Sequence, residues 1–97
     1  MKLEARIRAE RKTIETVCDL RRAFNLRQLS GDALTDALQR LAADYRRAVG
    51  SECSAFIAAM LRRASVAPGA ADLDFGFIST AWIENTRTGR LPDAWTL

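Results

Sequence analysis

The stretch SGDALTDALQRLAADYRRAVG, residues 30–50, carries the clearest structural signal in this chain. Its apolar residues recur every three or four positions and so mark one face of a helix; they are Leu34, Ala37, Leu38, Leu41, Ala42, Tyr45, Ala48 and Val49. Ser30 and Asp32 are good N-cap residues, and Gly50 stands where a left-handed C-cap is expected. The stretch therefore predicts a helix over residues 32–49 with one face in the core.

A second long helix is predicted before this one, over residues 3–26. Its apolar residues form a single stripe at helical spacing; they are Leu3, Ile7, Ile14, Val17 and Phe24. Two positions that would complete the stripe, Glu10 and Arg21, are charged. This interruption argues against a continuous coiled-coil seam and suggests that the first two turns extend beyond the body or meet another chain.

Two shorter helices are predicted after it, over residues 52–65 and 73–85. Ser51 is the expected N-cap of the first, and Asp72 or Asp74 that of the second. Their inward-facing positions are expected to be Cys53, Phe56, Ile57, Met60, Leu61 and Ala64, and then Phe75, Ile78, Ala81 and Trp82. The turn signals that follow predict an irregular tail over residues 86–97.

The fold class follows from these four segments. No Asn-Gly or Asp-Gly hairpin turn signal appears in the chain, and no strands are expected. The 97 residues fit one domain, and short loops between helices favour antiparallel neighbours. The sequence predicts an all-α fold: a single domain over residues 1–97, built as a small three- or four-helix bundle with an irregular C-terminal tail.

The composition argues against an enzyme. The chain has no histidine, which removes the commonest general base and the commonest zinc ligand. No glycine-rich phosphate cradle is present, and Cys18 and Cys53 are interpreted as buried structural residues. We therefore expect no catalytic residues, no cofactor and no metal ligands.

Four acidic residues in the last third of the chain offer one alternative to this expectation. Asp72, Asp74, Glu84 and Asp93 suggest an acid/base pair or a hard-metal site. They lack the regular spacing of a calcium loop and the glycine expected at its sharp turn. Helix capping explains the two aspartates more simply.

The charge distribution suggests a possible nucleic-acid interface. The net charge of +3 is concentrated at the front, where residues 1–27 hold eight cations and four acids. The candidate phosphate contacts on the first helix are Arg8, Arg11, Lys12 and Arg22. Acidic residues interleave with them, so an ordinary solvated helix surface is the favoured interpretation.

The C-terminal quarter suggests a protein interface. Four of the seven aromatic residues lie in the last 23 positions, including Phe77 and Trp95. A tryptophan this close to the end is ordered only if it docks. Either Trp95 plugs one end of the bundle, or it joins Leu91, Leu97 and Phe77 in an anchor for a partner.

Self-association is expected through the first helix, with Leu3, Ile7 and Ile14 as contacts in a homodimer or larger oligomer. The leading functional hypothesis is a non-enzymatic adaptor, assembly factor or inhibitor that binds another macromolecule, most simply a protein. The alternative is a nucleic-acid-binding protein that uses the arginine-rich first helix. Short accessory proteins of bacterial viruses (phages) and mobile elements often have this character.

The expected location is the cytoplasm. The basic N-terminus is not followed by the apolar stretch of a secretion signal, and no segment has the uninterrupted apolar length of a membrane span. No membrane partner is expected.

Overall fold

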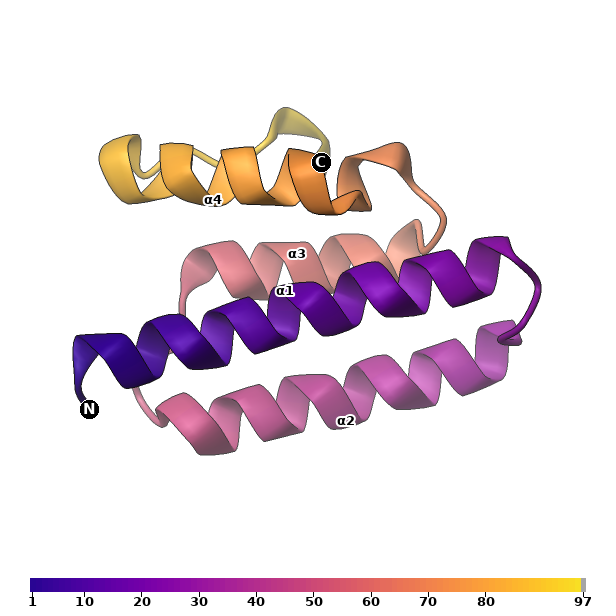
Figure 1. Ribbon diagram of the computed structural model, residues 1–97, viewed down its shortest axis with the longest axis horizontal. Coiled ribbons are helices and arrows are strands. Elements are labelled where there is room, and N and C mark those ends of the chain that lie inside the picture. The colour runs from indigo at the N-terminus through magenta and orange to yellow at the C-terminus, as the bar shows by residue number, and fades with distance from the viewer. Residues whose placement is uncertain (97) are drawn as a thin grey trace.

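The computed structural model describes residues 1–96 of the chain, and 77% of it is helical. Four α-helices run alternately up and down, as Figure 1 shows. They are α1 (Leu3–Asn25), α2 (Gly31–Val49), α3 (Ala55–Val66) and α4 (Phe75–Thr88). Two single 3₁₀ turns, Ala71–Leu73 and Asp93–Trp95, precede and follow α4. No strand occurs among the described residues, so the predicted all-α bundle is confirmed.

The helix α1 lies at the centre of the arrangement and contacts each of the other three helices. Its stripe meets the apolar faces of α2, α3 and α4 in one core. The largest fully buried side chains of this core are Phe56, Ile14, Ile57, Met60, Leu73, Ile78 and Val17. Because every helix buries one face against α1, packing rather than intrinsic helix propensity supplies most of the helical stability.

The two long helices match their predicted bounds to within one residue. The Ser30 hydroxyl accepts a hydrogen bond from the Ala33 backbone N–H at 3.1 Å, so Ser30 is the N-cap and α2 starts at Gly31. Gly50 ends α2 with a φ of 59°, a backbone conformation that glycine adopts without steric cost. No helix in residues 1–96 has the length and apolar character needed to cross a membrane.

The start of α3 differs from the prediction, and so does the position of Cys53. Ser54 rather than Ser51 is the N-cap, because its hydroxyl accepts hydrogen bonds from the backbone N–H groups of Phe56 and Ile57. The hydroxyl oxygen of Tyr45 accepts the Ser54 N–H at 2.9 Å and so holds this corner against α2. Cys53 consequently lies in the preceding loop and is exposed, so its interpretation as a buried residue is wrong.

The helix α4 is shifted toward the C-terminus relative to its prediction. The Asp74 carboxylate accepts the backbone N–H groups of Gly76 and Phe77, so Asp74 is the N-cap. The helix continues to Thr88, where Gly89 ends it in the left-handed conformation with a φ of 74°. Phe75, predicted to face inward, is the first residue of the helix and is 49% exposed.

The two charged residues that interrupt the α1 stripe both lie on its buried side. The Trp82 indole N–H donates to a Glu10 carboxylate oxygen at 3.1 Å, and Glu10 itself is buried. The Arg21 guanidinium Nε donates to the backbone carbonyl of Ala70 at 2.7 Å. Each charge therefore joins α1 to the C-terminal half of the chain through a hydrogen bond, which offsets the cost of its burial.

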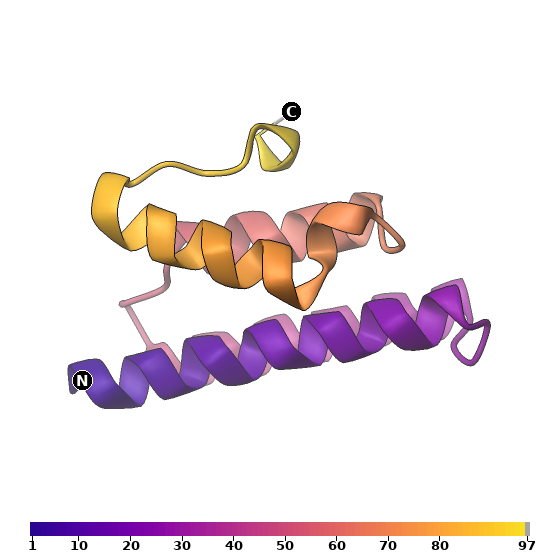
Figure 2. The same cartoon turned by 45° about the horizontal axis from the view of Figure 1, so that its top comes forward.

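The C-terminal segment, residues 89–96, is irregular as predicted, apart from the single 3₁₀ turn Asp93–Trp95. After Gly89 the chain reverses and runs back beside α4, as Figure 2 shows. The Asn85 side-chain amide donates to the Arg90 carbonyl at 2.8 Å and stabilises this reversal. The turn Asp93–Trp95 then packs on α3, so the segment forms part of the bundle.

Candidate functional site

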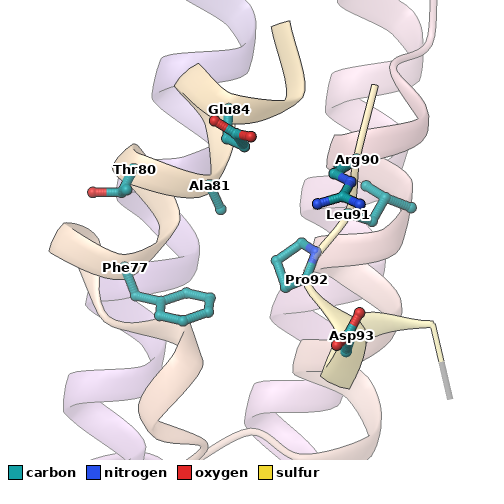
Figure 3. Close-up of a pocket in the computed structure, with 8 residues that line it drawn as sticks. All are labelled: Phe77, Thr80, Ala81, Glu84, Arg90, Leu91, Pro92 and Asp93. Atoms are coloured by element: carbon teal, nitrogen blue, oxygen red, sulfur yellow. The ribbon is translucent and has the colours of Figure 1, made fainter. Parts of the chain in front are cut away.

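Two surface grooves flank α4, one on each side. The first, which we call the tail cleft, lies between α4 and the C-terminal segment and has a volume of about 580 Å³. One wall comes from α4 and the other from the segment that follows the Gly89 reversal (Figure 3). The lining residues are Phe77, Thr80, Ala81, Glu84, Arg90, Leu91, Pro92 and Asp93.

The tail cleft has an apolar centre. Figure 3 shows the Phe77 ring turned toward Pro92 across the cleft, whereas the Thr80 side chain points away. The charged groups of Glu84, Arg90 and Asp93 lie around this centre. An apolar middle with a polar rim is the usual composition of a protein–protein contact, and the volume is large enough for an aromatic side chain of a partner.

Trp95 lies behind the cleft and holds its outer wall in place. Its ring centroid is 5.0 Å from that of Phe56 on α3 and 6.5 Å from that of Phe77 on α4. Its indole N–H is buried and has no hydrogen-bond partner among the described residues. Apolar and aromatic packing alone therefore attaches the C-terminal segment at this point.

The four residues predicted to bind a partner are placed differently from one another. Phe77, 44% exposed, and Leu91 both line the tail cleft, so the structure brings these two together. Trp95 is only 4% exposed and plugs the bundle, because α3 and α4 enclose its ring. Of the two alternatives for Trp95, the structure therefore supports the plug of the bundle and contradicts the exposed anchor. Leu97 lies outside the described residues.

The second groove, which we call the α1–α4 groove, lies on the opposite flank of α4. It consists of two adjoining hollows that share Trp82 and Ile83. Toward the N-terminus of α1 its walls include Leu3 and Ile7, and toward the start of α4 they include Phe75. Ile83 is 61% exposed, which makes it one of the most exposed large apolar side chains of the chain.

A polar contact lies at the base of the α1–α4 groove. Glu10 accepts the Trp82 N–H with one carboxylate oxygen, while its other oxygen is 3.8 Å from Nε of Arg6. Both partners of Glu10 are only partly buried, whereas Glu10 itself is buried. This contact fixes the distance between α1 and α4 along the groove.

The three residues predicted to mediate self-association also lie in different environments. Leu3 and Ile7 are exposed walls of the α1–α4 groove. Ile14, at 1% exposure, belongs to the core and reaches the groove only as part of its floor. Its role as a self-association contact is corrected, because the packing of α4 on α1 already covers it.

The predicted nucleic-acid contacts all lie exposed on the outer side of α1. Arg8, Arg11, Lys12 and Arg22 have solvated side chains, and Arg11 also lines the α1–α4 groove. Arg22 lies 3.9 Å from the Asp19 carboxylate, and Glu4 and Glu15 are exposed on the same helix. The face is thus a mixture of both charges.

Two of the four acidic residues of the last third, Asp72 and Asp74, have structural roles. Asp72 pairs through both carboxylate oxygens with Arg63 on α3, at 3.2 Å to Nε and 3.0 Å to a terminal nitrogen. Asp74 caps α4. No cluster of three or more metal-ligating side chains occurs in residues 1–96. Of the two aspartates interpreted as helix caps, Asp74 is confirmed as a cap, whereas Asp72 pairs with Arg63 instead.

The two thiols occupy different environments. Burial, together with the nearby carboxylates of Asp74 and Asp19, raises the pKa of the Cys18 thiol to about 11. Such a thiol stays protonated and unreactive at neutral pH. Cys53 is exposed, and its thiol donates to the Gly50 carbonyl at 3.4 Å.

Sequence reasoning missed three features of these grooves. Ile83 was not identified as an exposed residue. It directly follows the inward-facing Trp82, and because adjacent residues of a helix point in different directions, the helical repeat signals that Ile83 faces away from the core. The contact between Glu10 and Trp82 joins residues 72 positions apart, so no local pattern signals it. Pro92 lies in the predicted irregular tail, and no sequence signal identified it as a wall of the tail cleft.

Comparisons of this chain with protein-family models, with curated protein sequences and with solved structures find no match.

Proposed function

We propose that this chain is a non-enzymatic helical interaction protein that binds another protein through the tail cleft. The observation that carries the proposal is the exposed Phe77 ring, which faces Pro92 and Leu91 across a groove of about 580 Å³. An exposed aromatic side chain at the centre of an apolar hollow is a typical binding hot spot. The expected occupant is a segment of a partner that inserts one large apolar side chain.

The way the cleft is built also supports binding. The reversal at Gly89 and the buried Trp95 hold both ends of the outer wall. A wall that is already ordered before the partner arrives loses little conformational entropy on binding. The mixed charges of Glu84, Arg90 and Asp93 at the edge add specificity rather than affinity.

Nucleic-acid binding by α1 is the competing function. Its candidate cations are exposed, but the acids Glu4, Glu15 and Asp19 share their helix. Phosphate contacts would be offset there by like-charge repulsion between DNA and the carboxylates. The geometry therefore favours the tail cleft.

The proposal is tested by selecting binders from a random peptide library against the purified chain. We expect selected peptides to share a large apolar side chain and to lose at least tenfold in affinity for a Phe77→Ala variant, as expected for a hot-spot aromatic. Phe75→Ala is the matched control, since it removes an equally exposed phenylalanine from the other flank of α4. Circular dichroism checks that both variants stay folded.

Two results would overturn the proposal. One is that selected peptides bind the Phe77→Ala variant as tightly as the original chain. The other is that no peptide is selected while duplex DNA binds with an affinity that falls steeply with salt. In that case charge reversal of Arg8, Arg11 and Lys12 should abolish binding, and the α1 face would be the functional surface.

A further inference from the structure

The exposed apolar residues of this chain are concentrated on the flank of α4 that faces α1. Eight large apolar side chains are exposed in the described part of the molecule. Four of the eight, Leu3, Ile7, Phe75 and Ile83, line the α1–α4 groove. The groove follows α1 from Leu3 to Ile14, which is about 16 Å or three helical turns. A groove of this length that is lined by several exposed large apolar side chains marks an interaction surface.

We propose that the α1–α4 groove is the contact surface of a homodimer, in which a second copy of this chain packs its own α1 and α4 onto the first. The two helices run antiparallel and form a layer with one face uncovered (Figure 1). Two such layers related by a two-fold axis make a four-helix arrangement that buries the uncovered face of each.

The exposed area of the chain agrees with this occupant. Its accessible surface is 6205 Å², whereas a compact monomer of 10.8 kDa is expected to expose about 5,500 Å². The excess of roughly 700 Å² is close to the ~800 Å² that each partner contributes to a standard protein interface. A second copy would therefore bring the exposed surface per chain to an ordinary value.

Charge complementarity also favours a second copy of this chain as the occupant of the groove, and it indicates where the two-fold axis of the dimer lies. Glu4 and Arg11 are exposed and lie two turns apart on one edge of α1, and the structure records no ion pair for either within residues 1–96. When two α1 helices cross antiparallel about an axis beside Ile7 and Arg8, Glu4 of each copy lies opposite Arg11 of the other. The contact thus contains two equivalent Glu4–Arg11 pairs, as the symmetry of an isologous interface requires.

The dimer surface is separate from the tail cleft. Phe75 and Phe77 are two positions apart on α4, and a separation of two on a helix places side chains on different faces. Dimerisation through the α1–α4 groove therefore leaves both tail clefts open. A dimer would present two clefts to a partner that carries two copies of the recognised segment, which increases the apparent affinity.

The test is light scattering on a size-exclusion column over a wide range of protein concentration. We expect a mass of about twice 10.8 kDa for the original chain. Ile83→Asp places a charge in the groove and should weaken dimerisation at least a hundredfold, so that the variant elutes as a monomer. Val66→Asp is the matched control, because Val66 is also highly exposed but lies at the end of α3. Thermal melting followed by circular dichroism shows whether each variant keeps its fold.

A charge exchange tests the position of the axis. Glu4→Arg should weaken the dimer roughly tenfold, and the double variant Glu4→Arg with Arg11→Glu should restore it. A chain that stays monomeric at every concentration would overturn the proposal and would leave the groove for a different protein. A dimer that survives Ile83→Asp would overturn it as well, because the copies would then meet elsewhere. Phe77→Ala should leave the mass unchanged, so this proposal can fail while the tail-cleft proposal stands.

Discussion

The two flanks of α4 are attached to the rest of the molecule by different physical means, although each depends on one tryptophan. On the α1 flank the Trp82 indole N–H donates to the buried Glu10 carboxylate at 3.1 Å. On the other flank the Trp95 indole N–H has no acceptor among the described residues, and its ring packs against Phe56 at 5.0 Å. The first attachment is polar and specific, whereas the second relies on the burial of apolar area.

This difference indicates which flank tolerates change. A buried hydrogen bond to a charged group costs more when one partner is removed than it contributes when both are present. Apolar packing instead tolerates exchange between side chains of similar shape. We therefore expect the α1 flank of α4 to be destabilised by substitutions that remove a hydrogen-bonding group. The flank beside the C-terminal segment should instead be destabilised by substitutions that change side-chain volume.

The largest effect is expected for Trp95→Ala. Removing this ring leaves a cavity between α3, α4 and the C-terminal segment, and comparable truncations cost about 3–5 kcal/mol. Because a domain of this size has a total stability of about 5–15 kcal/mol, the variant should be close to unfolding. Urea denaturation followed by circular dichroism measures the loss.

Trp95→Phe is the control for that variant. It keeps an aromatic ring beside Phe56 and removes an N–H group whose unsatisfied burial costs about 1–3 kcal/mol. This gain offsets part of the lost area, so Trp95→Phe should cost much less than Trp95→Ala. Equal losses for the two variants would show that the indole N–H makes an important hydrogen bond.

A smaller effect is expected for Trp82→Phe on the other flank. The substitution keeps a ring but leaves the buried Glu10 carboxylate without its donor, at a cost of about 1–3 kcal/mol in unfolding free energy. In a Glu10→Leu background the same substitution should cost far less, since no carboxylate remains to be satisfied. A double-mutant cycle measures this coupling between Trp82 and Glu10, and additive losses would contradict it.

The last prediction concerns Cys18 on α1, near the N-cap of α4, and has no effect at neutral pH. The Cys18 pKa is about 11 in the folded chain and 9.0 in the absence of folding. Between these values the unfolded chain loses the thiol proton while the folded chain keeps it, so the folded state becomes less stable as pH rises from 9 toward 11.

The measurement for this prediction is the unfolding free energy of the original chain and of a Cys18→Ala variant across that pH range. The difference between the two should shrink as pH rises and become constant above the folded pKa. A difference independent of pH would mean that burial and the nearby carboxylates do not raise the pKa of the Cys18 thiol. Other groups that titrate in this range are present in both proteins and cancel.

Much of the fold could be predicted because its signals are local. The apolar spacing and the caps of residues 30–50 depend only on neighbours in sequence, and α2 matches its prediction to one residue. The start of α3 could not be predicted in this way. Ser51 and Ser54 are both suitable N-caps, and the Tyr45 hydroxyl that binds the Ser54 backbone comes from α2.

The candidate site was only partly predictable for the same reason. Phe77 and Leu91 were identified from the unusual aromatic content of the C-terminal quarter, and both line the tail cleft. Trp95 could not be assigned from sequence, because its burial depends on whether the segment after Gly89 folds back onto α3. Exposed and buried tryptophans have the same local sequence pattern.

The sequence by itself determined that this chain is helical, where its long helices lie and which of their faces are apolar, since these follow from periodicity and capping between near neighbours. Only the tertiary structure decided that Glu10 and Arg21 belong on a buried face, that Trp95 is core, and that Ile83 and Phe75 stay uncovered. Each of these depends on contacts between residues far apart in the chain. Such contacts form only when the helices pack together, so no local pattern records them.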